Sequence, residues 1–119
     1  MAVRVPILQQ GRILIASVQE ELTDSDILDL QARILERVVK GRSTGVIIDV
    51  GALDVIDSFG TRTLSEIAGA VQLRGAKMVI VGIQPEVALS MVLLGLTLDT
   101  VTTTLDLDAG IAVLNGNRR

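Results

Sequence analysis

Hydrophobic positions along the chain form two alternating patterns. Short, nearly continuous apolar runs are typical of buried strands, and longer stretches with apolar residues every three or four positions are typical of helices. The first pattern predicts strands at Val5–Gln9, Arg12–Val18, Gly45–Val50, Ala76–Val81 and, short and rich in threonine, Val101–Thr104. The second predicts helices from Thr23 or Asp24 to Lys40, over Phe59–Leu73, from Pro85 to about Leu94, and over Asp106–Leu114.

The order of these elements predicts an α/β fold. Two strands come first, joined by a tight turn at Gln10-Gly11, and such a pair is antiparallel. Strands then alternate with helices, which indicates parallel pairing. We therefore expect a mixed sheet, with its first strand pair antiparallel and the rest mainly parallel, packed by about four helices. A chain of 119 residues favours one domain spanning 1–119.

Residues that favour helix ends support these boundaries. Thr23 or Asp24 is a suitable N-cap for the first helix, and Gly41 is a suitable residue just beyond its end. Ser58 stands where the second helix should begin, so its ordinary role would be that of an N-cap. Pro85 fits the first helical position of the third helix.

Composition excludes several classes of function. The sequence has no histidine and no cysteine, so nucleophile systems that pair serine or cysteine with histidine cannot form within it. Zinc sites with nitrogen and sulfur ligands are excluded as well. Scattered basic residues, a net charge of −3 and a single aromatic, Phe59, argue against a nucleic-acid surface. The longest mainly apolar stretch, Ala88–Leu98, is too short to span a membrane, and we expect a cytoplasmic protein.

The loop before the second helix carries the most suggestive chemistry. The segment GVIIDVGALDVIDSFG, from Gly45 to Gly60, predicts a buried strand, an acidic loop and a serine at a helix start. Asp54 and Asp57 resemble a catalytic carboxylate pair, but two acids before a helix usually cap or solvate it. A phosphate on Ser58 would face free backbone N–H groups and the positive end of the helix dipole. It would also add about 1.5–2 negative charges to an acidic surface.

Two other phosphate chemistries fit less well. A phosphoacceptor receiver domain would use Asp49, at the end of a strand, together with a lysine after the last strand. The chain has only Lys40 and Lys77, and neither follows Val81. The glycine-rich motifs of nucleotide-binding folds are absent too.

The third predicted helix, PEVALSMVLLG, is apolar nearly all round. Its apolar residues are Val87, Leu89, Met91, Val92, Leu93 and Leu94. One stripe must face the sheet. The remainder is either buried by the fold or exposed as a surface that docks another subunit.

The segment IIDVGALDVIDSFG resembles the phosphorylation loop of STAS domains, and the order of strands and helices is similar to that fold over nearly the whole chain. The opening VPILQQGRILIASVQEELTD and the segment GAKMVIVGIQPEVALSMVLLG resemble the small single-domain stressosome members of the family. Free anti-sigma factor antagonists carry small residues after the acceptor serine, whereas Phe59 and Gly60 follow Ser58 here, which favours the stressosome branch.

The resemblance implies a regulatory protein without enzymatic activity. Such proteins assemble with larger RsbR-type STAS paralogues into a large shell that holds an RsbT-type serine/threonine switch kinase. Phosphorylation of the acceptor, which matches Ser58, releases the kinase. Mg-ATP belongs to that kinase, so no cofactor is expected for this chain. The surface expected to contact the kinase consists of Asp54, Asp57, Phe59 and Gly60, although Phe59 is favoured as a core anchor because single aromatics are usually buried.

The hypothesis is therefore a stressosome scaffold and kinase antagonist of the bacterial cytoplasm, switched at Ser58. One alternative is a free anti-anti-sigma factor regulated by phosphorylation of the same residue. The other is an enzyme of receiver-like or hydrolase type, against which the missing histidine, cysteine and late lysine argue.

Overall fold

Over the residues that the structure describes, the fold is built on one mixed sheet of five strands. The computed structural model describes residues 5–93 and 101–116. The strands lie side by side in sequence order and are β1 (Ile7–Gln10), β2 (Ile13–Ser17), β3 (Gly45–Asp49), β4 (Lys77–Val81) and β5 (Thr102–Thr104). Only β1 and β2 pair antiparallel, whereas β2 through β5 are parallel. The predicted α/β class and mixed sheet are confirmed.

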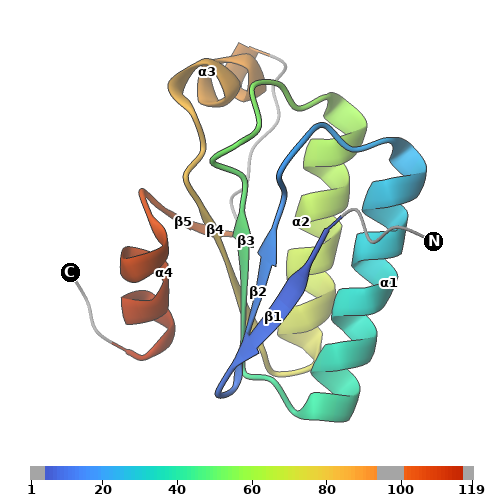
Figure 1. The fold of residues 1–119 in the computed structure, drawn as a ribbon, viewed down its shortest axis with the longest axis vertical. Helices are drawn as coiled ribbons and strands as arrows, with labels where there is room; N and C mark the ends of the chain where they lie inside the picture. Colours follow the sequence, from blue (N-terminus) through green and yellow to red (C-terminus); the bar gives the residue numbers. More distant parts are fainter. Residues whose placement is uncertain (1–4, 94–100, 117–119) are drawn as a thin grey trace.

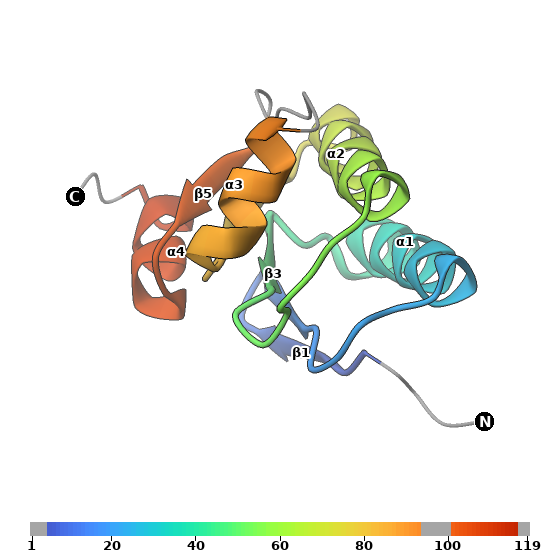
Figure 2. The same ribbon diagram turned by 90° about the horizontal axis from the view of Figure 1, so that it is seen from above.

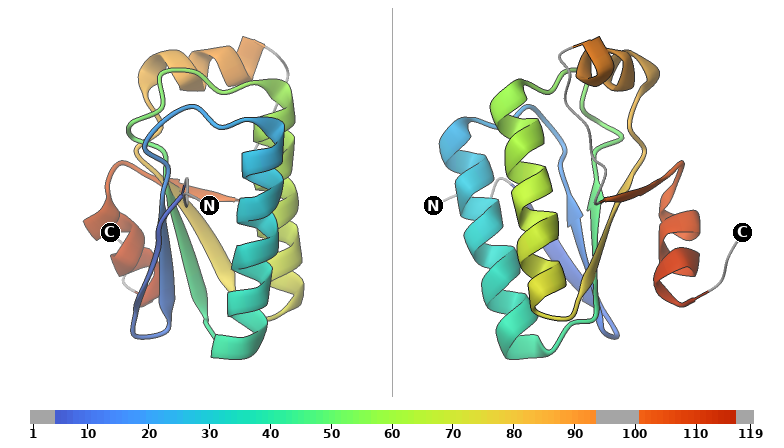
Figure 3. Two further views of the ribbon diagram at one scale, coloured as in Figure 1. Left: turned by 45° about the vertical axis from the view of Figure 1, so that its right-hand side comes forward. Right: turned by 180° about the vertical axis from the view of Figure 1, so that it is seen from behind.

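Helices cover both faces of the sheet and one of its ends. They are α1 (Asp24–Gly41), α2 (Ser58–Leu73), α3 (Pro85–Leu93) and α4 (Leu107–Leu114). Helices α1 and α2 lie together on one face and α4 lies on the other (Figures 1 and 3). Helix α3 crosses the end at which the parallel strands finish (Figure 2). The loops that leave β3 and β4 therefore meet beneath α3.

The central strands are apolar on both sides because each side is covered. On β2, Leu14 and Ala16 pack into the larger core beneath α1 and α2. The alternate residues Ile13 and Ile15 belong to a smaller core beneath α4. This division is the one that the alternation of residues in the sequence predicts for a strand buried on both faces. Strand β5, in which Thr102 and Thr104 are partly buried and Thr103 is exposed, lies at the edge where its threonines were expected.

The ends of α1 confirm one expectation and correct another. Thr23 caps the helix: its hydroxyl accepts from the Asp26 N–H while the Asp26 carboxylate accepts from the Thr23 N–H. Gly41, however, is still helical, and the left-handed residue is Arg42, with φ 52°. The chain enters β3 almost at once, since the N–H groups of Thr44 and Gly45 both donate to the carbonyl of Arg12. The predicted end of the third helix, at Leu94 and Gly95, lies outside the described residues.

Two loops at the carboxyl ends of the strands are fastened to each other. The N–H of Val50 donates to the carbonyl of Val81 over 3.1 Å, which continues the β3–β4 pairing beyond the strands. The side-chain amide of Gln84 donates to the carbonyl of Gly51 over 2.9 Å. Gly82, at φ +78°, approaches Gly51 so closely that a Cβ on it would lie 3.2 Å from the Gly51 Cα. The loop before α2 is thus held against the loop before α3.

Candidate phosphorylation site

Asp57, and not Ser58, is the N-cap of α2. The Asp57 carboxylate accepts a hydrogen bond of 2.7 Å from the N–H of Gly60, and its backbone is extended, with φ −91° and ψ 178°. Its carbonyl also accepts from the N–H and the hydroxyl of Thr61. Ser58 is the first helical residue. The expectation that Ser58 acts as an ordinary cap is therefore wrong, because the neighbouring aspartate already fills that role.

The Ser58 side chain forms no hydrogen bond that stabilises the described part of the chain. It is partly exposed, and its hydroxyl makes no hydrogen bond with residues 5–93 or 101–116. The backbone N–H groups of Ser58 and Phe59 also have no acceptor among those residues. Free N–H groups in the first turn of a helix favour a negatively charged group close to them. A hydroxyl in this place is accessible, and its modification would break no bond that holds the fold.

The two residues after Ser58 shape the start of the helix. Phe59 is partly buried and packs against the larger core, which confirms the core role expected for it. Gly60 is buried, so it has little surface to offer a partner. A Cβ on Gly60 would lie 3.1 Å from Ile56 Cγ1 and 3.2 Å from the capping oxygen of Asp57. Glycine at this position leaves room for the cap.

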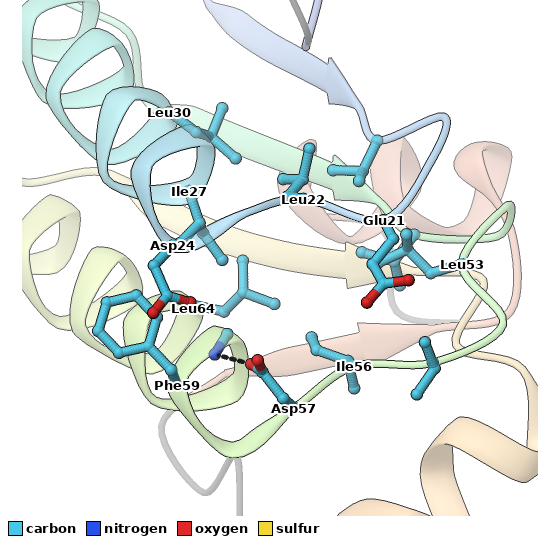
Figure 4. A pocket seen from close by; sticks show the side chains of 14 residues that line it. Glu21, Leu22, Asp24, Ile27, Leu30, Leu53, Ile56, Asp57, Phe59 and Leu64 are labelled. Carbon is cyan, nitrogen blue, oxygen red and sulfur yellow. Dashed lines mark hydrogen bonds between the residues drawn. The ribbon is translucent and has the colours of Figure 1, made fainter.

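A small pocket opens beside the acceptor. It has a volume of about 70 Å³ and lies between the start of α1 and the loop that leads into α2. Its floor is apolar, with Ile27, Leu53 and Leu64, while Asp57 lines it together with acids of the β2–α1 segment (Figure 4). Those acids are Glu21 and Asp24. The two segments meet because β2 and β3 are adjacent parallel strands, whose carboxyl ends bring their loops together.

Acidic side chains gather at this end of the molecule. Asp54 and Asp57 are both exposed, as the sequence predicts for loop acids that stay hydrated. Asp49 is partly buried, and its carboxylate accepts from the N–H of Gly51 over 2.9 Å. Asp49 thus supports the loop in the described structure, a role different from the phosphoacceptor of a receiver domain.

Helix α3 presents apolar side chains to solvent next to this loop. Val87 and Met91 face inward and are buried. Leu89, Val92 and Leu93 are 60%, 72% and 77% exposed, and we call these three residues the α3 face. Of the two alternatives left open by the sequence, burial and exposure, exposure holds for this stripe of the helix. Clusters of exposed apolar side chains commonly mark interaction surfaces.

Neither a metal site nor a membrane span is found in the part of the chain that the structure describes. Over residues 5–93 and 101–116, no three acidic residues are grouped so that they could hold a metal ion. No helix within those ranges is long and apolar enough to cross a bilayer.

A sheet of this topology, with an acidic loop and a serine at the start of α2, can be compared with known families of protein domains. The sequence profile of the STAS domain matches residues 4–109. The chain belongs to the STAS domain family.

Within the family, the chain is similar to stressosome proteins. It shares 34% identity with RsbS S58E of Moorella thermoacetica, with a TM-score of 0.83 over 95% of this chain and 96% of the other. A structure described as the molecular architecture of the stressosome, a signal integration and transduction hub, matches with 30% identity and a TM-score of 0.75, covering 93% and 96% of the two chains. RsbT co-antagonist protein RsbRA of Bacillus subtilis (strain 168) is 38% identical over 82 residues, or 69% of this chain. The chain spans only 30% of the length of that curated relative.

Proposed function

We propose that this protein is a non-enzymatic stressosome component that holds an RsbT-type switch kinase and releases it when Ser58 is phosphorylated. The observation that carries the proposal is that two adjacent residues at the start of α2 have different roles. Asp57 caps the helix, and the adjacent Ser58 hydroxyl is partly exposed and bonded to none of the described residues. A switch needs a residue that can be modified without unfolding the domain, and Ser58 meets that requirement.

Two opposing electrostatic effects decide what a phosphate on Ser58 would do. The free N–H groups of Ser58 and Phe59 and the helix dipole favour it, by about 0.3–1 kcal/mol for an exposed charge. Asp57 and Asp54 oppose it, and both are exposed to water, which weakens the repulsion. The expected net effect on the fold is small, because the favourable term is at most about 1 kcal/mol and water screens the repulsion from two exposed acids. The effect on a bound partner is large, because the phosphate brings about 1.5–2 negative charges to its contact surface.

The kinase is proposed to dock across the acceptor loop and the α3 face. The hydrogen bond from Gln84 to Gly51 and the close approach of Gly82 to Gly51 fasten these two parts of the surface together. Asp54, Asp57 and Phe59 would provide the contacts nearest the acceptor, and Leu89, Val92 and Leu93 the apolar ones. The name of the Bacillus subtilis relative, RsbT co-antagonist protein, supports an RsbT-type partner.

Assembly with larger STAS paralogues forms part of the proposal. Its support is the 30% identity with a stressosome chain over nearly the full length and the likeness to an RsbR-type protein. No cofactor is proposed for this chain, since Mg-ATP would arrive with the kinase. Cytoplasmic localisation follows from the same proposal.

The test is a pull-down from extract of the native cells, with wild-type protein, Ser58→Asp and Ser58→Ala as baits. Partners are identified by mass spectrometry, and circular dichroism shows that all three baits are folded. We expect larger STAS paralogues with every bait, and a small kinase with wild type and Ser58→Ala only. Equal kinase recovery with Ser58→Asp would overturn the switch. Recovery of an anti-sigma kinase with its sigma factor, and of no paralogues, would assign the protein to the anti-anti-sigma class.

A further inference from the structure

The end of the molecule opposite Ser58 carries a basic pocket. It lies where β1 turns into β2, where α1 leads into β3 and where α2 leads into β4, the lower loops in Figure 1. Its volume is about 410 Å³, within the range of about 300–1,000 Å³ that is typical of small-molecule sites. The residues that line it are Arg12, Val38, Val39, Arg42, Ser43, Thr44, Arg74 and Gly75.

The charge in this pocket has one sign. Among the described residues, three arginines line it and no acidic residue does. The connecting segments 10–12, 40–44 and 72–77 contain further basic residues, Lys40 and Lys77, and again no acid. Lys40 is paired with Glu36 at 3.9 Å, whereas Arg12, Arg42 and Arg74 form no ion pair within the described residues.

Helix dipoles account for only part of this charge. Helices α1 and α2 both end at the pocket, and cations near a helix C-terminus are stabilising. Each helix end carries about −0.5 of an elementary charge, so the two together offset about one of the three arginine charges. The pocket therefore keeps a net positive charge, although the protein as a whole carries −3.

Ser43 gives a second, independent indication of a ligand. The residue is 5% exposed and belongs to the pocket wall, yet its hydroxyl has no hydrogen-bond partner in the described structure. A buried polar group without a partner costs stability, and most buried polar groups in folded proteins are bonded. The Oγ atom is shielded from solvent, so the Ser43 side chain would have to turn about χ1 to reach an acceptor held by the guanidinium groups.

We propose that this pocket binds a small phosphate-bearing anion, held by Arg12, Arg42 and Arg74 and by the Ser43 hydroxyl. Planar guanidinium groups match the oxygens of phosphate, and charge-assisted hydrogen bonds are the stronger ones. The proposal is independent of the switch at Ser58, because the pocket lies at the opposite end of the strands. It assigns a second site to the same domain.

The test uses the full chain, with inorganic phosphate and ADP as probes and chloride at matched ionic strength as the control. Thermal unfolding and amide NMR shifts are recorded. We expect both probes, or ADP alone, to raise the melting temperature of the protein. We also expect them to change the NMR chemical shifts of the backbone amides of residues 12, 42–44 and 74–75. A response to inorganic phosphate of the same size as that to ADP identifies the phosphoryl group itself as the ligand, and a stronger response to ADP identifies a phosphate ester.

Three variants make the test specific. Arg42→Gln and Arg74→Gln should each weaken binding about tenfold, the effect of one charge-assisted hydrogen bond. Arg62→Gln, an exposed arginine of α2 outside the pocket, is the charge-matched control and should bind like wild type. Ser43→Ala should raise the melting temperature in chloride, since it removes an unsatisfied hydroxyl, and should reduce the rise caused by the probe.

Several results would overturn the proposal. Equal responses to phosphate and chloride would do so, as would NMR shifts spread over the whole surface. A loss of binding in Arg62→Gln as large as that in Arg42→Gln would show that binding depends on the net charge of the protein and not on this pocket. Self-association that depends on Arg42 and Arg74, with no response to either probe, would make the pocket a contact between protein copies.

Discussion

The capping oxygen of Asp57 lies 2.7 Å from the N–H of Gly60, and the same oxygen would lie 3.2 Å from a Cβ placed on that glycine. A side chain at the donor of the hydrogen bond that starts α2 would therefore crowd the capping oxygen. Ser58 stands between the two residues and contributes nothing to the bond. The residues that fix the start of the helix, Asp57 and Gly60, flank Ser58, and the Ser58 hydroxyl takes no part in this bond.

Gly60→Ala tests this crowding. Alanine is the better helix former, so propensity alone predicts a gain in stability. We expect instead a loss of about 1 kcal/mol or more in the free energy of unfolding, because the new methyl group would press on the cap and on Ile56. Gly69→Ala in the same helix is the matched control, since a Cβ there meets no atom within 4 Å. The control should gain about 0.5–1 kcal/mol, and urea denaturation measures both.

The assignment of the cap predicts different costs at two adjacent residues. Asp57→Ala should lower the free energy of unfolding by about 1 kcal/mol, whereas Asp57→Asn should keep most of it, because asparagine is also a good N-cap. Ser58→Ala should change it by less than about 0.5 kcal/mol. Thermal melts of the three variants distinguish the roles. A loss at Ser58→Ala equal to that at Asp57→Ala would return the capping role to the serine.

The contact between Gly82 and Gly51 predicts a large effect of a small substitution. Gly82→Ala introduces a residue at φ +78° and a Cβ only 3.2 Å from backbone of the facing loop. Gly75→Ala shares the positive φ, at +85°, but its Cβ would meet nothing within 4 Å. Gly75→Ala should cost about 1–2 kcal/mol, and Gly82→Ala roughly twice as much. Equal losses in denaturant titrations would mean that the two loops can separate freely.

Much of this architecture could be predicted from the sequence because burial leaves a local signal. Strand β2 is apolar on both sides since α1 and α2 cover one face and α4 the other. Helix α1 shows its buried stripe of Ile27, Leu30, Ile34 and Val38 at helical spacing. In both cases the pattern of neighbouring residues carries the same information as the packing.

The details at helix ends could not be predicted in this way. In the dipeptide Asp57-Ser58 both residues are good N-caps, so local preference does not choose between them. At the end of α1, glycine preference favours Gly41 for the left-handed position, yet Arg42 occupies it because the chain must pair at once with Arg12. The link from Gln84 to Gly51 joins residues 33 positions apart, and no local pattern records it.

The α3 face gives the sharpest test of partner binding apart from the acceptor. Leu89→Ser and Val92→Ser replace side chains that are 60% and 72% exposed, so each should change the free energy of unfolding by less than about 0.5 kcal/mol. If the kinase docks there, each should weaken its capture about tenfold or more, as truncation of an apolar anchor does at other interfaces.

Leu73→Ser is the matched control for these variants. Leu73 is 90% exposed and lies at the far end of α2, away from the α3 face. It should leave both stability and kinase capture unchanged, as measured by melts and by quantitative pull-down with wild-type bait in parallel. Kinase recovery that falls equally in all three variants would point to general loss of apolar surface. Recovery that falls in none of them would confine the contact to the loop around Ser58, because α3 would then contribute no binding energy.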